Sequence, residues 1–288
     1  MEFVALSDGT RLRTWTTGTA TARTATTTGT ATTRPPVILV HGGPGLWDYL
    51  EPVATLLDDL TVVHRFDQRG CGGSDPSDEQ TMQRLCDDID ELRRHWGHEQ
   101  IVVIGHSFGA TLALTYAAAH PEHVARVGYL SGVGLGDWYT PYDRERTLRM
   151  SDEQSARLTE LQRQSRNAEE EIEFRALSWF TDHANRERAW TWALEDAAVP
   201  FPINFAANKA INAETNSWTD DHQAAVAASL PMPVWLVHGT GDPRPASAVR
   251  ALAEHIPDHR LHLIEGAGHS LWRERPDALR EVLQALLS

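Results

Sequence analysis

The 288-residue chain has 40 acidic and 26 basic residues, and its formal net charge of −14 disfavours a polyanionic partner such as nucleic acid. Its two cysteines, Cys71 and Cys86, lack the spacing of a metal-binding or redox pair, so we expect neither a metal nor another cofactor. The amino terminus has no basic segment followed by an apolar run, and no stretch approaches the roughly 18 apolar residues of a membrane span. We therefore expect a cytoplasmic protein without a membrane partner.

Strand patterns dominate both ends of the chain. Alternation over residues 2–16 predicts an opening strand and hairpin, and the Thr-, Ala- and Gly-rich tract at 16–33 predicts a long exposed turn. Apolar runs that end in glycine-containing turns predict buried parallel strands at 37–45, 61–70, 101–109, 124–132, 234–242 and 261–269. Helical patterns at 82–96 and 110–120 separate several of these runs, so the order predicts an α/β fold with a mostly parallel sheet of about eight strands.

Residues from about 135 to 230 break this rhythm. They contain no comparable apolar run, are rich in charged helix formers, and hold five of the ten tryptophans. We expect a helical cap at 135–230, inserted between two parts of one core at 1–134 and 231–288. Most of the tryptophans are expected to pack cap helices together, and a minority, Trp192 among them, to line a pocket.

The candidate nucleophile is Ser107, at the centre of Gly105-His106-Ser107-Phe108-Gly109. The G-x-S-x-G pattern follows an apolar strand and opens a helical run, which is the context of a nucleophile elbow in an α/β-hydrolase fold. Glycine at either side of the serine removes Cβ atoms that would collide in so tight a turn. His106 is expected to be a packing or hydrogen-bonding neighbour, because it points away from the nucleophile.

A serine hydroxyl needs a base, and the base needs a carboxylate to orient it. Asp242 and His269 follow two later strands, in the order Ser, acid, His that this fold requires. The carboxyl ends of parallel strands are where such sheets place their sites. We therefore expect a triad of Ser107, Asp242 and His269. The alternatives are a surface-loop histidine and a turn-capping Asp242, with Asp220 or Asp221 as substitute acids.

The tetrahedral intermediate needs two N–H donors, which form an oxyanion hole. The backbone N–H of Phe108 and that of Gly43, in His41-Gly42-Gly43-Pro44-Gly45, are the candidates. A glycine-rich loop can also hold a phosphate. The loop lacks the endings of nucleotide-binding loops, which makes that alternative remote.

Five segments together resemble the proline iminopeptidase family of α/β-hydrolases: HGGPG at 41–45, DQRGCGGS at 67–74, GHSFGA at 105–110, GTGD at 239–242 and GAGH at 266–269. The resemblance implies an enzyme that removes an N-terminal residue, often proline, from peptides. It also implies the triad and oxyanion positions given above, and cap carboxylates that hold the substrate ammonium. Glu195 and Glu214 are the candidates for that role. Family members commonly have GGSWG around the nucleophile, whereas this chain has GHSFG, which many esterases share.

The sequence therefore predicts a metal-independent serine hydrolase that acts on a small molecule or short peptide through an acyl-enzyme. An aminopeptidase of the proline iminopeptidase type is the first hypothesis. A carboxylester, lactone or small-amide hydrolase on the same core is the second, because fold alone does not fix the substrate. A non-catalytic ligand-binding member of the fold is the third, and the complete triad argues against it. Nothing in the sequence indicates the oligomeric state.

Overall fold

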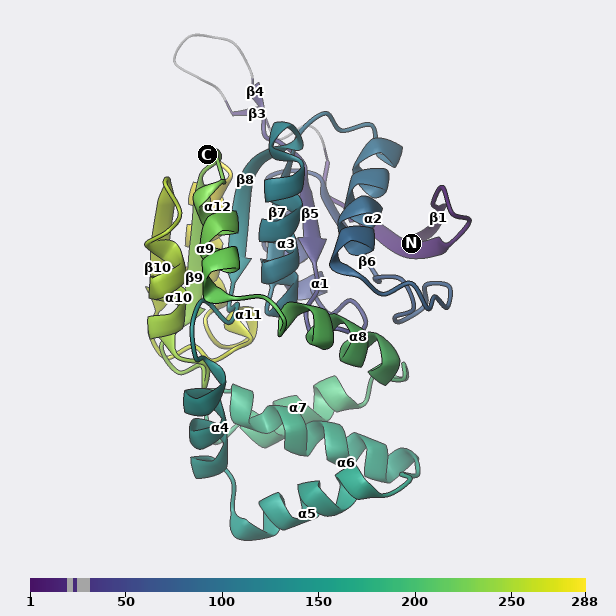
Figure 1. The fold of residues 1–288 in the computed structure, drawn as a ribbon, viewed down its shortest axis with the longest axis vertical. Helices are drawn as coiled ribbons and strands as arrows, with labels where there is room; N and C mark the ends of the chain where they lie inside the picture. The colour runs from purple at the N-terminus through teal and green to yellow at the C-terminus, as the bar shows by residue number, and fades with distance from the viewer. Residues whose placement is uncertain (20–22, 25–31) are drawn as a thin grey trace.

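An eight-stranded sheet runs through the molecule in the order β1-β2-β6-β5-β7-β8-β9-β10 (Figure 1). This computed structural model describes residues 1–19, 23–24 and 32–288. Within this sheet, as far as the structure describes it, only the pairs β1–β2 and β2–β6 are antiparallel, so the prediction of a mostly parallel sheet of about eight strands is confirmed. The strands are β1 (Glu2–Ala5), β2 (Arg11–Thr17), β5 (Val37–Val40), β6 (Val63–Phe66), β7 (Ile101–His106), β8 (Val124–Leu130), β9 (Val234–Gly239) and β10 (His259–Ile264).

The turn predicted at 16–33 lies largely outside the described residues. Within it, β3 (Arg23–Thr24) and β4 (Thr32–Thr33) pair antiparallel as a separate two-stranded ribbon.

Alternate residues of the central strands enter opposite faces of the sheet, because the side-chain period of a strand is two. Ile38 and Val40 of β5 pack with α2 (Met82–His95), α3 (Phe108–Ala119) and α10 (Ala246–Ala253). Val37 and Leu39 pack on the other face with α1 (Glu51–Thr55) and α12 (Pro276–Leu286). All four β5 residues are fully buried, which explains why this strand reads as a continuous apolar run.

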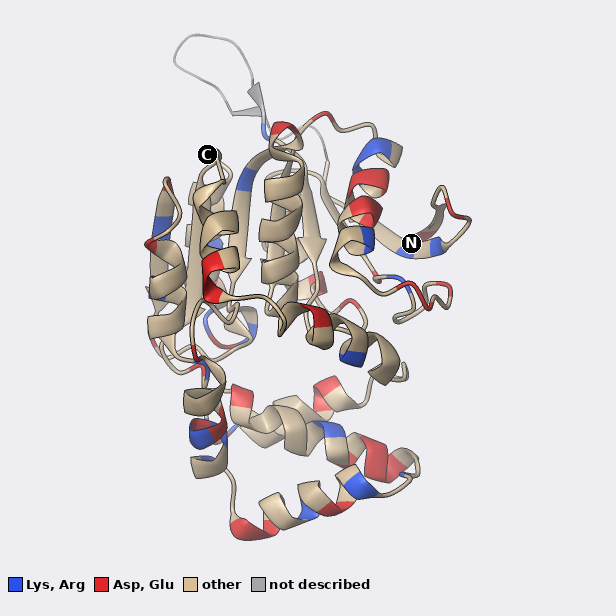
Figure 2. Ribbon diagram, viewed as in Figure 1, with Lys and Arg blue, Asp and Glu red and all other residues tan. Residues whose placement is uncertain are grey.

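Helix α3 is apolar on every side, and Figure 2 shows no charged residue along it. This helix needs no polar face, because it lies against the sheet on one side and contacts α2 and α9 (Asp220–Ala228) on others. The single turn η1 (Pro121–His123) connects it to β8. The short helix α11 (Leu271–Glu274) precedes α12. Of the helices described, none is long and apolar enough to cross a bilayer.

The segment between β8 and β9 is helical, and its first part stands off the carboxyl end of the sheet (Figure 1). Leu161, Ala176, Phe180 and Ala193 belong to a small apolar cluster of its own. By contrast, Ile211 and Ala227 belong to the same core cluster as Ile38 and Val40 of β5. The last two helices of the segment, which carry these residues, therefore pack on the core. The helices are α4 (Tyr139–Leu148), α5 (Asp152–Arg163), α6 (Ala168–Trp179), η2 (Phe180–Asp182), α7 (Ala189–Ala197), α8 (Phe205–Thr215) and α9.

Candidate active site

Ser107 lies at the tight turn between β7 and α3, with φ of +57°. A non-glycine residue in this region is strained, and such strain is common at active sites. The turn closes because its flanks are glycines: a Cβ on Gly105 would collide with the Gly109 carbonyl, and one on Gly109 with the Val40 carbonyl. The Ser107 N–H donates to Leu130 O of the neighbouring strand at 2.9 Å. The serine is thus fixed at the N-terminus of α3.

Asp242 and His269 are joined directly. Nδ1 of His269 donates to Oδ2 of Asp242 at 2.7 Å, which leaves Nε2 of a neutral imidazole as the proton acceptor. Burial alone raises the pKa of Asp242, but the charges of His269 and Arg244 outweigh burial and lower it. The carboxylate therefore stays ionised and holds the imidazole in one tautomer.

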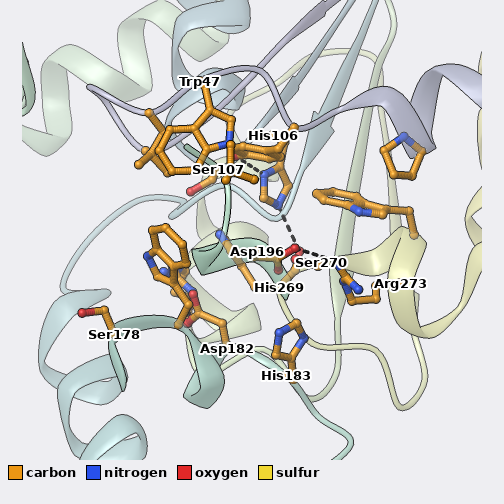
Figure 3. A pocket seen from close by; sticks show the side chains of 18 of the residues that line it. Trp47, His106, Ser107, Ser178, Asp182, His183, Asp196, His269, Ser270 and Arg273 are labelled. Atoms are coloured by element: carbon orange, nitrogen blue, oxygen red, sulfur yellow. Dashed lines mark hydrogen bonds and ion pairs between the residues drawn. The ribbon is translucent and has the colours of Figure 1, made fainter. Parts of the chain in front are cut away.

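Ser107 and His269 lie on the wall of the same cavity (Figure 3). Within the part of the chain that the structure describes, the serine hydroxyl makes no hydrogen bond with the imidazole. Catalytic hydrogen bonds are often long without substrate and tighten in the complex. Ser107 and His269 thus share one cavity wall, and His269 is already paired with the buried Asp242.

A buried chain of hydrogen bonds connects the glycine loop to the loop that carries His269. The Gly42 N–H donates to the Tyr49 hydroxyl at 2.8 Å, and that hydroxyl lies 2.7 Å from Nδ1 of His106. Nε2 of His106 lies 3.0 Å from the His269 carbonyl, which can only accept. Because burial lowers the pKa of His106 well below its usual range, the ring is neutral and carries its proton on Nε2. Tyr49 must then donate to Nδ1, so the tautomer of His106 is fixed.

The glycine loop lies against the nucleophile. A Cβ on Gly42 would come within 2.7 Å of Ser107 Cβ, and Gly43, with φ of +53°, lines the cavity. Two residues at the start of α8 hold this loop: the Asn204 N–H donates to Gly45 O and the Asn208 amide to Pro44 O, each at 2.8 Å. The Phe108 N–H lies in the first turn of α3, where backbone donors lack helical partners.

The cavity has a volume of about 370 Å³ and contains two carboxylates, each bonded to an arginine. Arg244 Nη1 donates to Asp182 Oδ1 at 2.9 Å and contacts Asp242 Oδ1 at 3.3 Å. Arg273 Nη2 donates to Asp196 Oδ1 at 2.5 Å. Burial raises the pKa of Asp196, and Arg273 opposes that rise. Each carboxylate keeps its second oxygen free of partners among the described residues.

Comparison with known proteins settles the family. A model of the alpha/beta hydrolase fold matches residues 35–276. The chain belongs to the α/β-hydrolase family. A Mycoplasma pneumoniae protein, named provisionally as a proline iminopeptidase, is 28% identical over 93% of this chain and 91% of its own length. The predictions of the fold and of a hydrolase are confirmed.

Solved structures of the same fold include enzymes of different names. The crystal structure of proline iminopeptidase from Mycobacterium smegmatis has a TM-score of 0.70 at 22% identity, over 99% of this chain and 97% of that one. A thermophilic esterase from Thermogutta terrifontis has the same TM-score of 0.70 at 21% identity, over 100% of both chains. At these identities the likeness establishes the α/β-hydrolase fold alone.

The cap residues expected to bind substrate in this α/β-hydrolase lie outside the cavity wall. Glu195 is exposed and pairs with Arg273 Nη1 at 2.7 Å. Glu214 accepts from the Met82 N–H at 3.0 Å and so caps the start of α2. Trp192 is buried behind the wall, with its ring centroid 5.2 Å from that of His183, which lines the cavity.

Asp182, Asp196 and Arg244 line the cavity, and sequence reasoning missed all three. A signal existed for Asp196. Ala189, Trp192, Ala193 and Ala197 form the buried face of α7 at helical spacing, and position 196 falls on the same side, whereas Glu195 falls outside it. Arg244 follows the acid by two positions, but its partner Asp182 is 62 positions away, so no local pattern reveals the pair.

The cap segment that contains Asp182 also holds the loop that carries His269. The His269 N–H donates to Asp182 O at 2.8 Å. The buried carboxylate of Glu274 accepts from Gly268 N at 2.5 Å on that loop, and from Asn185 N at 2.7 Å on the cap. His269 is therefore held from both the core and the cap of this α/β-hydrolase.

Proposed function

We propose that this α/β-hydrolase is an aminopeptidase of the proline iminopeptidase type, which releases the N-terminal residue of a short peptide. The observation that carries the proposal is that one cavity brings Ser107 and His269 together with two carboxylates from the cap. The relative matched over 93% of the chain, and named provisionally as a proline iminopeptidase, supports it.

In this proposal Ser107 Oγ attacks the carbonyl carbon of the first residue and passes its proton to Nε2 of His269. The N–H groups of Gly43 and Phe108 stabilise the oxyanion. The C–N bond then breaks, the leaving amine takes the proton from His269, and an ester to Ser107 remains. Water attacks this ester, gives a proton to His269, and the free amino acid departs as Ser107 recovers its hydrogen. Asp242 stabilises the imidazolium each time it forms.

The substrate ammonium would bind the free oxygens of Asp182 and Asp196, in place of the Glu195 and Glu214 expected from sequence. An ionised carboxylate offers about four acceptor positions, so the bonds from Arg244 and Arg273 leave room for an ammonium. A hydrogen bond between charged groups contributes about 1.5–3 kcal/mol where water is largely excluded.

The test compares prolyl and alanyl arylamides, the same amides with an acylated amine, and short-chain aryl esters, with Ser107→Ala as the inactive control. An aminopeptidase cleaves the free-amine amides and loses that activity when the amine is acylated. Cleavage of esters alone, or equal cleavage of free and acylated amides, would overturn the proposal.

A matched pair of variants tests the ammonium site. Asp196→Asn and Glu195→Gln each remove one carboxylate that is bonded to Arg273, but only Asp196 lines the cavity. We expect Asp196→Asn to raise KM for prolyl arylamide about tenfold to a hundredfold. Glu195→Gln should change KM less than about threefold, which is the scale of an exposed ion pair. Equal effects of the two variants would place the ammonium elsewhere.

One observation favours a second candidate, an ester, lactone or small-amide hydrolase. Both cavity carboxylates already have an arginine partner, so the cavity wall carries no unpaired acidic side chain. A neutral acyl group would suit such a wall. The aryl esters in the same assay distinguish this candidate from the first.

A further inference from the structure

A second, smaller pocket adjoins the main cavity, on the side of the glycine loop. It has a volume of about 210 Å³ and shares Gly43, Leu46, Ser178 and Trp179 with the main cavity. Gly43 is the expected oxyanion donor, so this side pocket begins next to the position of the reacting carbonyl. In Figure 3, Ser178 lies across the main cavity from Arg273, on the side away from the Arg273–Asp196 pair.

The walls of the side pocket are apolar. Beyond the shared residues it is formed chiefly by Pro44, Phe174, Ile203 and Phe205. Phe205 is 51% exposed, which places it at the outer mouth, between α6 and α8. An exposed aromatic ring at the rim of an apolar pocket is suited to contact a ligand that is itself apolar.

The few polar side chains of the side pocket already have partners. Ser178 Oγ donates to Phe174 O at 2.7 Å. The Asn208 amide donates to Pro44 O and accepts from Asn212 at 3.0 Å. Arg175 is buried, bonded to Glu171 at 2.8 Å and to Val199 O at 3.0 Å. These bonds occupy most of the polar atoms of the side pocket, which has no carboxylate among the described residues of its wall, whereas two carboxylates line the main cavity.

We propose that the side pocket binds an apolar leaving group: in a peptide, a large apolar side chain on the second residue. This inference rests on the proposed function, because an ammonium held by Asp182 and Asp196 puts the acyl part in the charged cavity. The part that departs then lies on the other side of the carbonyl, where the side pocket opens.

The experiment measures kcat/KM for prolyl dipeptide amides whose second residue is Gly, Ala, Leu or Phe. For the wild type we expect a rise of about tenfold or more from Gly to Leu, the usual value of filling an apolar pocket with several methylene groups. Ser178→Phe fills the boundary between the two cavities and should reduce that rise to less than about twofold.

Ser178→Ala is the matched control, because it removes the same hydroxyl without filling space, and it should keep the wild-type preference. Phe205→Ala is the second variant, and its exposed position makes it a test that remains if Ser178→Phe fails to fold. It should lower kcat/KM for the Phe and Leu substrates more than for the Gly substrate. A flat wild-type series would overturn the inference. An equal loss of kcat/KM on every substrate in both Ser178→Phe and Phe205→Ala would also overturn it.

Failure of the proposed function gives a different result. If prolyl arylamides are not cleaved but esters are, the same variants are assayed with acetate esters of alcohols of increasing length. A preference for long alcohols that Ser178→Phe abolishes would support the side pocket without the peptidase. A kcat/KM that does not change with the length of the alcohol would overturn the inference.

Discussion

Replacing Arg244 with methionine is expected to destabilise the fold, because it leaves two carboxylates without their cation. The Arg244 guanidinium bonds to Asp182 at 2.9 Å and contacts the Asp242 carboxylate at 3.3 Å. The side chain of Asp242 is fully buried, and those of Asp182 and Arg244 are each 12% exposed. Removing one member of a buried ion pair leaves the other charge uncompensated, which costs folding free energy.

The size of the loss follows from this burial. Removing one partner of a buried ion pair costs about 3–5 kcal/mol. Asp242 keeps its bond to Nδ1 of His269 at 2.7 Å, which offsets part of that cost. We therefore expect Arg244→Met to lower the free energy of unfolding by about 2–4 kcal/mol.

Asp182→Asn provides a graded test. It removes one of the two carboxylates beside Arg244 and leaves Asp242 in place, so the loss should be about half as large. Arg260→Met is the control, because Arg260 lies over the ring of Trp235 at 4.3 Å, on β10, and should change the free energy of unfolding by less than about 1 kcal/mol. The assay is denaturant titration at neutral pH. A loss for Arg244→Met no larger than that for Arg260→Met would refute the electrostatic reasoning.

Three further changes have defined outcomes. Ser107→Ala should lower kcat by at least about four orders of magnitude with an unchanged unfolding midpoint; substantial residual turnover by purified protein would exclude Ser107 as the nucleophile. Tyr49→Phe leaves Gly42 N–H and His106 Nδ1 without their partner and should lower the free energy of unfolding by about 2–4 kcal/mol, measured by denaturant titration. A loss below about 0.5 kcal/mol would contradict the buried chain of hydrogen bonds through Tyr49. Gly109→Ala places a methyl group against the carbonyls of Val40 and His41 and should yield insoluble or unfolded protein; near-native stability by the same titration would show that the elbow tolerates a side chain.

The sheet was largely predictable from sequence, because its central strands are buried on both faces. Residues 37–40 and 101–106 are buried throughout, and a run of that kind has few alternatives in a βαβ order. The order of Ser107, Asp242 and His269 could be predicted for a related reason. Each follows a strand, and parallel strands bring their carboxyl ends to one edge.

The cap was harder, because its helices are weakly patterned. On α7 a rotation of one residue, about 100° around a helix, separates Asp196 in the cavity from exposed Glu195. The chain offers two adjacent carboxylates, and only the phase of a short helix distinguishes them. Arg244 bonds to Asp182 of the cap, which is 62 positions away in sequence. Tyr49 and His106, which are hydrogen-bonded to each other, are 57 positions apart. Such pairs exist only once the chain has folded.

The hydrogen bonds between residues 182–185 and the loop at 268–274 limit how this enzyme can be re-engineered. Transplanting another relative's insertion between 135 and 230 would replace the carbonyl that receives the His269 N–H and the acid that neutralises Arg244. A chimera made to alter selectivity would thereby also alter the surroundings of His269. Grafts that retain Asp182, or that bring Glu274 and its neighbours along as one unit, would separate those two effects.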